Sequence, residues 1–242
     1  MKAMIFAAGL GTRLKPLTNN KPKALIEVNN ITIIERIIKR FIEANICEIV
    51  INVHHFPEKI LEFLHQNKNF GIDIVISDET DLLLETGGGL KKASWFFDDN
   101  KPFFVHNADV LTNLSLSQML DFHVKNKSLA TLAVRNRKTS RYFLFDNESK
   151  LCGWQNTEKN EIIHTRSYTS VNQLAFSGVQ IISPEIFNYL NQKGPFSITK
   201  SYIELSKSNI ISAYQHDNDF WFDIGTLEKL NIANEFYKKL EK

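Results

Sequence analysis

A pair of glycines and a run of cations follow the first apolar segment of the chain. Gly9 and Gly11 come directly after the apolar residues 3–8, and small residues let backbone N–H groups approach a phosphate or a base closely. Four cations and two prolines follow: Arg13, Lys15, Pro16, Lys21, Pro22 and Lys23. Because the prolines restrict the backbone between the charges, the segment suits a polyphosphate. The glycine pair alone is as typical of a tight turn.

Two aspartates lie at positions where carboxylates can do chemistry. Asp109 comes just beyond the apolar run Phe103–Asn107, at the expected carboxyl end of a buried strand, where open α/β sheets place their ligands. Asp223 follows two aromatic residues and precedes Gly225; taken alone, it is typical of a helix cap. Mg²⁺ usually takes one or two protein carboxylates together with phosphates and waters, so Asp109 indicates a ligand or metal site.

The first half of the chain alternates apolar runs with segments of helical period. Four runs are apolar on both faces, as buried parallel strands must be: Ala3–Ala7, Glu48–Val53, Ile72–Ile76 and Phe103–Asn107. Helices are expected around Ile34–Phe41, where apolar residues recur at helical spacing, and near Glu58–Asn67, Leu90–Phe97 and Ser117–Lys125. This alternation predicts an α/β fold with a Rossmann-like, mostly parallel mixed sheet flanked by helices.

After about Lys127 the pattern changes to short strand-like runs separated by turns. We expect small antiparallel additions to the sheet at Thr131–Arg135, Tyr142–Asp146, Lys150–Gln155 and Ala175–Ile182, covering one side of the site. Helical periodicity returns at Pro184–Leu190, Thr199–Ser206 and Thr226–Lys239. No linker or internal repeat is present, so residues 1–242 are expected to form one domain.

Composition excludes several classes of protein. Apolar residues make up 43% and charged residues 23% of the chain, and the formal net charge is only +2, so disorder and a nucleic-acid surface are not indicated. The two cysteines have no metal-ligand spacing and fit a reducing compartment. Residues 1–10 look like a short signal peptide, but the apolar run is too short and leads directly into Gly-Thr-Arg. We expect a cytoplasmic protein that does not bind membranes.

The glycine and lysine pattern resembles the signature of the sugar-1-phosphate nucleotidyltransferase family. Nine positions match over 17 residues: Gly9-x-Gly11-Thr12-Arg13-x-x-Pro16-x-Thr18-x-x-x-Pro22-Lys23-x-Leu25. Further similar segments are Leu84–Gly89, Asn107–Val110, Phe176–Gly178 and Trp221–Thr226. The resemblance covers nearly the whole chain and is strongest to the short branch with N-acetylmuramate uridylyltransferases and mannose- or heptose-phosphate guanylyltransferases. This branch implies one nucleotidyltransferase domain without a left-handed β-helix extension.

The resemblance also implies roles for individual residues. Arg13 and Lys23 would be catalytic, with Arg13 on the outgoing pyrophosphate and Lys23 on charge developing at the α-phosphate. The implied nucleotide-binding residues are Ala8, Gly9, Gly11, Thr12, Arg13, Lys23, Thr86, Gly87 and Asn107, and the implied metal pair is Asp109 and Asp223, holding Mg²⁺. Fixed cations and N–H donors are effective catalysts of such transfers, because charge accumulates on the phosphoryl oxygens.

The acceptor side of the site is less well marked. Many relatives carry a Glu-Lys-Pro element for the sugar phosphate, which this chain lacks, and Glu158-Lys159 lies in a polar turn. We expect Arg141, Ser177 and Gly178 to contact the sugar phosphate instead. Ala108 stands where the family has glycine. His106 invites a role as general base, but the sugar phosphate, with a second pKa near ~6, arrives mostly as the dianion, so we expect His106 to be structural.

The predicted function is transfer of a nucleotidyl group from an NTP to a sugar 1-phosphate, with UTP slightly preferred over GTP. The expected partners are these two substrates, on a monomer or small homo-oligomer. A dinucleotide-dependent oxidoreductase is disfavoured because the third glycine and the acidic residue after the second strand are absent. A regulatory subunit that binds nucleotide sugars, and a cytidylyltransferase acting on an alcohol phosphate, remain alternatives.

Overall fold

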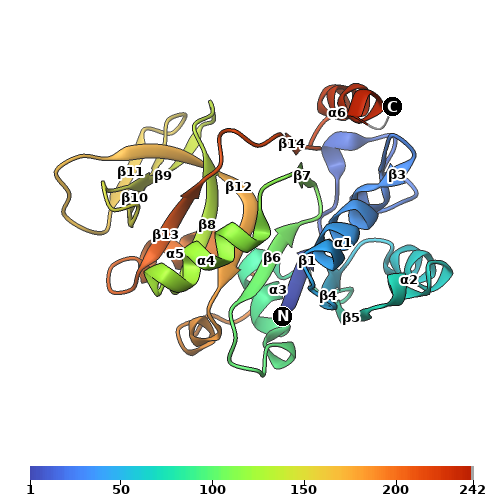
Figure 1. The fold of residues 1–242 in the computed structure, drawn as a ribbon, viewed down its shortest axis with the longest axis horizontal. Coiled ribbons are helices and arrows are strands. Elements are labelled where there is room, and N and C mark those ends of the chain that lie inside the picture. The colour runs from blue at the N-terminus through green and yellow to red at the C-terminus, as the bar shows by residue number, and fades with distance from the viewer. Residues whose placement is uncertain (241–242) are drawn as a thin grey trace.

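The computed structural model describes residues 1–240, which are built around a ten-stranded sheet (Figure 1). The strands of this sheet are β1 (Lys2–Phe6), β4 (Glu48–Val53), β5 (Asp73–Asp78), β6 (Phe103–Asn107), β8 (Ala130–Arg135), β9 (Arg141–Phe145), β10 (Leu151–Asn156), β11 (Glu161–His164), β12 (Asn172–Ile182) and β13 (Ile211–Gln215). The spatial order is β11-β10-β9-β12-β6-β1-β4-β5, with β8 pairing β12 and β13. β5, β4, β1 and β6 are parallel, and β12 joins β6 antiparallel. The predicted mostly parallel mixed sheet is confirmed.

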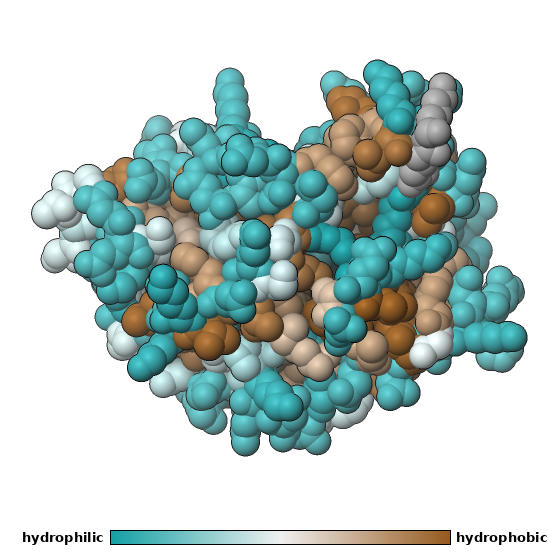
Figure 2. Space-filling model, in the orientation of Figure 1, coloured by the Kyte–Doolittle hydropathy of each residue, from teal (hydrophilic) through white to brown (hydrophobic). Residues whose placement is uncertain are grey.

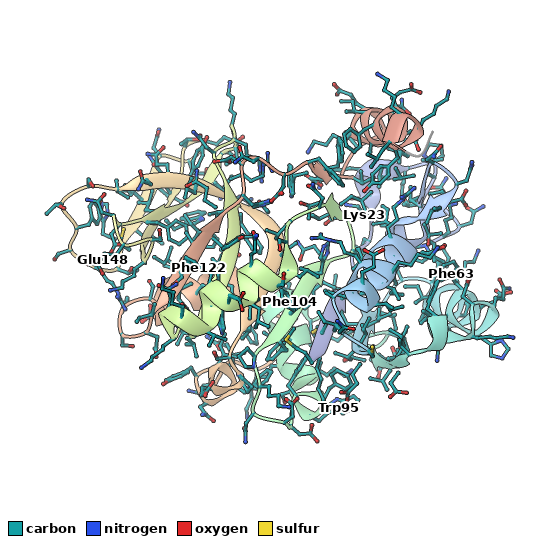
Figure 3. The ribbon with its side chains drawn as sticks, viewed as in Figure 1. Lys23, Phe63, Trp95, Phe104, Phe122 and Glu148 are labelled. Atoms are coloured by element: carbon teal, nitrogen blue, oxygen red, sulfur yellow. The ribbon has the colours of Figure 1, made fainter. Side chains whose placement is uncertain are left out.

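Alternation along the parallel strands divides the core into two layers. In β1, Ala3 and Ile5 face one apolar cluster and Met4 faces the other, because successive side chains of a strand point to opposite faces. The helices are α1 (Ile33–Glu43), α2 (Pro57–Gln66), α3 (Glu85–Lys92), α4 (Leu116–Asn126), α5 (Ile198–Leu205) and α6 (Leu227–Leu240). Figure 1 shows α1 on the near side of the parallel strands and α3 behind them. Figure 3 labels Phe104 of β6 at the centre of the molecule.

Helix α1 illustrates how the sequence pattern produces this packing. Five of its side chains are buried against the sheet: Ile33, Ile34, Ile37, Ile38 and Phe41. Burial of each contributes about 1.5–3 kcal/mol. The Thr32 hydroxyl caps the first turn by accepting from the Glu35 N–H at 3.3 Å. The opposite, solvent side carries charged residues, and hydrophilic residues likewise cover much of the face in Figure 2.

None of the helices within residues 1–240 has the length and apolar character needed to cross a membrane.

Some predicted elements differ from the observed ones. The helix expected from Leu90 begins at Glu85, because the intervening glycines are themselves helical and packed closely against residues 194–196. The segment after Ser183 forms only a 3₁₀ helix, Pro184–Asn188, and β13 joins β8 in the parallel sense. The sequence pattern also missed several short strands: β2 (Glu27–Val28), β3 (Ile31–Thr32), β7 (Val110–Thr112), β11, β13 and β14 (Trp221–Asp223). Of these, β7 and β14 pair with each other at the site.

His106 is a buried residue of β6 and fits the structural role predicted for it. Burial, and secondarily the Arg40 cation, lowers the pKa of its imidazole to about 3. Its ring packs edge-on against Phe41, and Nδ1 donates to the Asn107 carbonyl at 2.9 Å. The imidazole is therefore neutral at physiological pH.

The lowered pKa of His106 makes the free energy of unfolding depend on pH. The unfolded imidazole binds a proton below about pH 6.5, whereas the folded one does not until about pH 3. This contribution to stability is complete above pH 6.5 and is lost as the pH falls, by about 2 kcal/mol at pH 5. Urea unfolding at pH 7 and pH 5 should show that His106→Gln removes about this much of the difference. An unchanged pH dependence in the variant would contradict the buried neutral imidazole.

Candidate nucleotide site

A cavity of about 390 Å³ opens at the carboxyl ends of the parallel strands β4, β1 and β6. Six of the residues expected to bind nucleotide or metal line it: Ala8, Gly9, Lys23, Thr86, Asn107 and Asp109. The other eight lining residues were not among the predicted site residues, although Glu85 lies in the predicted segment Leu84–Gly89: Phe6, Ala7, Ala24, Asn52, Leu83, Glu85, Ala108 and Ser197. Apolar walls with a few convergent polar groups are typical of a small-molecule site.

The glycine turn positions Lys23 against the mouth of the cavity. Gly11 has a φ of +63°, and a Cβ there would lie 3.0 Å from the Thr18 methyl and 3.1 Å from Lys23 Cβ. The Thr18 hydroxyl donates to the Gly11 carbonyl at 2.9 Å. Glycine is therefore required both by backbone conformation and by close approach. The exposed residues Thr12 and Arg13 form a 3₁₀ turn directly after it.

Asp109 and Asp223 meet through the pairing of β7 with β14. Asp223 lies opposite Val110 in this ladder, and the Ile224 N–H donates to the Asp109 carbonyl at 2.7 Å. Lys23 Nζ contacts Asp109 Oδ2 at 2.6 Å. Figure 3 labels Lys23, which lies beneath α6 in this view. Two segments 114 positions apart in the chain are thus neighbours through this strand pairing.

Further cations surround Asp223. Lys229 Nζ, on the first turns of α6, contacts Asp223 Oδ2 at 2.8 Å. A Cβ on Gly225 would lie 2.9 Å from Asp223 Oδ1 and 3.2 Å from Arg13 Nη2. The guanidinium of Arg13 and the carboxylate of Asp223 therefore both border the bare Cα of Gly225. Cations from three separate segments, at Arg13, Lys23 and Lys229, converge on this pair of carboxylates.

The carboxylate pair fits a divalent cation that is shared with bound phosphates. Within residues 1–240, no group of three or more His, Cys, Asp or Glu side chains is arranged to hold a metal ion. Two carboxylates with neighbouring cations are suited to Mg²⁺, which binds one or two protein carboxylates and fills its remaining positions with phosphate oxygens and water. Zinc would instead require a closed or nearly closed set of protein ligands.

A buried hydrogen-bond chain fixes the back wall of the cavity. Asn52 Oδ1 accepts from the Ala7 N–H at 2.8 Å, and Asn52 Nδ2 donates to Glu79 Oε1 at 2.7 Å. The second oxygen of Glu79 accepts from the Leu84 N–H at 3.0 Å. Glu79 is only 1% exposed, and buried polar groups of this kind require partners. These hydrogen bonds join the loop after β1 to the loop before α3.

A model of the nucleotidyl transferase family matches residues 2–240. The chain belongs to this family. It is 30% identical over 93% of its length to a mannose-1-phosphate guanyltransferase of Yarrowia lipolytica, covering 61% of that protein. It is 29% identical over 92% of its length to an N-acetylmuramate alpha-1-phosphate uridylyltransferase of Caulobacter vibrioides, covering 91% of it. The chain thus spans about three fifths of the first relative and nearly all of the second.

The fold also matches a solved structure. A putative glucose-1-phosphate thymidylyltransferase from Bacillus anthracis aligns with a TM-score of 0.79 at 19% identity, over 98% of this chain and 94% of that one. This match confirms the fold of the nucleotidyl transferase family. The resemblance to sugar-1-phosphate nucleotidyltransferases that the signature predicts is confirmed by the family model and by the named relatives.

The N–H of Gly87 is engaged within the protein. It donates to the Phe196 carbonyl at 2.8 Å, and a Cβ at Gly87 would lie 2.4 Å from the Phe196 ring. Thr86 Oγ1 accepts from the Ile198 N–H at 3.1 Å. The glycines of α3 therefore allow close packing against residues 194–198, and Gly87 supports the cavity wall from behind.

Gly89 packs against the buried hydrogen-bonded pair Asn52 and Glu79. A Cβ there would lie 2.5 Å from Glu79 Oε1 and 2.9 Å from Asn52 Nδ2. Gly89→Ala should lower the free energy of unfolding by about 1–3 kcal/mol and raise the KM for NTP, since the loops that form the cavity would shift. Urea unfolding and steady-state kinetics measure both effects. Glu79→Asp withdraws the carboxylate, so the double variant should lose less stability than the sum of the single losses; strict additivity would contradict the contact.

The residues expected on the acceptor side divide into two groups. Gly178 has a φ of +80°, and a Cβ there would lie 3.0 Å from Asn107 Nδ2, so Gly178 adjoins the site. Ser177 is buried, and its hydroxyl is hydrogen bonded to His216 Nε2 at 2.8 Å. Arg141 is exposed at the start of β9, opposite Asn156 of β10. Gly178 thus borders the cavity-lining residue Asn107, whereas the Ser177 hydroxyl is paired with His216 and Arg141 is exposed.

Proposed function

We propose that this chain transfers a nucleotidyl group from an NTP to a sugar 1-phosphate and releases pyrophosphate, with Mg²⁺ as its metal. The observation that carries the proposal is the pairing of β7 with β14, which makes the segment of Asp223 a neighbour of Asp109, a residue that lines the cavity together with Lys23. A cavity bounded by backbone and glycine-rich loops suits a base and ribose, and the cations beyond it suit phosphates.

In this proposal, each side chain acts on the charge of the two substrates. The NTP base and ribose occupy the cavity, and the triphosphate extends toward the exposed turn that carries Thr12 and Arg13. Lys23 neutralises charge that develops on the α-phosphate, and Arg13 holds the departing pyrophosphate. The sugar phosphate attacks in line as a dianion, so no general base is required. The neutral, buried His106 is consistent with this direct transfer.

Asp109 and Asp223 would hold the Mg²⁺ that the substrates bring. When bound, the ion supplies positive charge between two anionic phosphates that would otherwise repel each other. Lys23 lies 2.6 Å from Asp109 and Lys229 lies 2.8 Å from Asp223. Both ammonium groups would therefore also be near phosphate oxygens held at these carboxylates.

Among nucleotides, we propose UTP over GTP. The supporting observation is the uridylyltransferase relative, nearly the whole of which this chain covers, whereas the guanyltransferase relative extends well beyond it.

A panel of substrates tests the proposed function. The four NTPs are each combined with Mg²⁺ and with a set of sugar 1-phosphates, and pyrophosphate release is measured. We expect turnover with at least one sugar 1-phosphate. Among the four NTPs, UTP should give the highest rate. A kcat/KM for GTP at least about tenfold above that for UTP would overturn the base preference. Binding of a nucleotide sugar without any turnover would instead support the regulatory-subunit alternative, and turnover with CTP and an alcohol phosphate would support the cytidylyltransferase alternative.

A further inference from the structure

Arg137 is a cation at the site to which the family signature gives no role. It follows β8, and its guanidinium carbon lies 4.5 Å from the centre of the Trp221 ring. Its Nη2 donates to the Phe176 carbonyl at 3.0 Å. Trp221 is fixed in turn, because its indole N–H donates to the Ser177 carbonyl at 2.9 Å. An aromatic face and a carbonyl thus hold the guanidinium in one orientation.

The position of Arg137 relative to the sheet separates it from the nucleotide cavity. The cavity lies at the ends of β4, β1 and β6, whereas Arg137 contacts β12, the next strand beyond β6. The residue that supports it, Trp221, is two positions before Asp223 in β14. Asp109 lines the cavity, and Asp223, on the strand paired with β7, is the carboxylate that acts on the charge of Arg137. In an in-line transfer the incoming phosphate must approach from the side opposite the pyrophosphate.

The charge of Arg137 and one of its N–H donors are partly buried. Burial lowers the pKa of its guanidinium, and the negative charge of Asp223 acts in the opposite direction. Its Nε is buried, and no hydrogen-bond acceptor for it occurs among residues 1–240. A buried donor without an acceptor is destabilising. Arg135, two residues earlier, differs in that its guanidinium donates to the carbonyls of His216, Asp217 and Asp219.

We propose that Arg137, positioned by Trp221, binds the phosphate of the incoming sugar 1-phosphate. This inference rests on the proposed function and assigns the acceptor cation that the missing Glu-Lys-Pro element would otherwise supply. It also replaces Arg141, which is exposed at the start of β9, as the arginine of the acceptor site. A planar guanidinium suits a phosphate because it can donate two parallel hydrogen bonds.

Steady-state kinetics of Arg137→Gln and Arg137→Lys test the assignment, using the NTP and sugar 1-phosphate that give the highest turnover in the substrate panel. Arg137→Gln should raise the KM for the sugar 1-phosphate by about 10- to 100-fold and change the KM for NTP less than about twofold. Arg137→Lys should recover part of the loss, since it keeps the charge without the planar fork. Lys138→Ala, which removes an adjacent exposed cation, is the matched control and should match the unmodified protein.

The outcomes separate this inference from the proposed function. Calorimetric titration with MgUTP shows whether the nucleotide cavity of each variant is intact, so a general folding defect is recognised. Active protein with an unchanged KM for sugar 1-phosphate in Arg137→Gln would overturn the role of Arg137 alone. A rise confined to the KM for NTP would also overturn it, by placing Arg137 on the nucleotide. If Arg141→Ala reproduced the acceptor defect while Arg137→Gln did not, Arg141 would be the acceptor arginine.

Discussion

Replacing Lys23 by alanine is expected to lower kcat by about 10²-fold or more, with a smaller effect on NTP binding. The Lys23 side chain is only 13% exposed, and its ammonium group lies 2.6 Å from Asp109 Oδ2, so its charge is fixed at the point where the phosphates must meet. Charge that builds up on the α-phosphate during transfer would lose its nearest fixed cation. Because the interaction strengthens in the transition state, the loss should appear in kcat rather than in KM.

Two further variants make the result specific to Lys23. Lys23→Arg keeps the charge but not the compact geometry, so partial activity is expected. Lys21→Ala removes a nearby lysine that lies 3.7 Å from Glu27. Because exposed ion pairs contribute little to stability, the fold should persist, and kcat should fall less than about threefold. Near-normal kcat in Lys23→Ala would exclude Lys23 from the chemical step. Equal losses in Lys21→Ala and Lys23→Ala would indicate general charge attraction instead.

Asparagine at Asp109 or Asp223 is expected to reduce activity by about 10³-fold, and the double variant should have a similar residual activity. The two residues belong to one pair of strands, joined by the hydrogen bond from the Ile224 N–H to the Asp109 carbonyl. If they hold one cation, removing either carboxylate misplaces both substrates, and little remains for the second change to remove. Asparagine preserves the shape of the side chain, so the fold should persist.

Activity measured over a range of Mg²⁺ concentrations checks this non-additivity. Each single variant should require more Mg²⁺ than the unmodified protein, whereas Asp121→Asn, on the exposed face of α4, should not. The paired assignment would be wrong if Asp223→Asn retained substantial activity with unchanged Mg²⁺ dependence while Asp109→Asn was inactive. Asp223 would then be a structural residue at the entry to α6.

The buried strands could be predicted from the sequence because burial on both faces leaves a continuous apolar run. The bounds predicted for β4 and β6 agree with the structure, and β1 differs by one residue at each end. Asp109 could be located for the same reason, since it directly follows the last of these runs. The glycine and lysine signature at residues 9–25 correctly indicated the family, because close backbone approach and fixed cations restrict the residue types at set spacing.

The contacts that complete the site depend on pairings that leave no local pattern. β7 and β14 have three residues each, too few for a two-residue period to be recognised. The partnership of Asn52 with Glu79 is similarly non-local, although a polar residue inside the apolar run of β4 is a signal that could have identified Asn52. Arg137 gave no signal because its role follows from the position of Trp221, 84 residues later in the chain.

Following a labelled α-phosphate shows whether the nucleotidyl group passes directly from the NTP to the sugar phosphate. The protein is incubated with Mg²⁺, NTP labelled at the α-phosphorus and the preferred sugar 1-phosphate, and the products are separated after a single turnover. We expect all transferred label to appear in a nucleotide sugar, one unlabelled pyrophosphate to form per turnover, and neither product to form without the sugar phosphate. Label retained covalently on the protein, or equal pyrophosphate release in the absence of the sugar phosphate, would contradict direct nucleotidyl transfer between the two substrates.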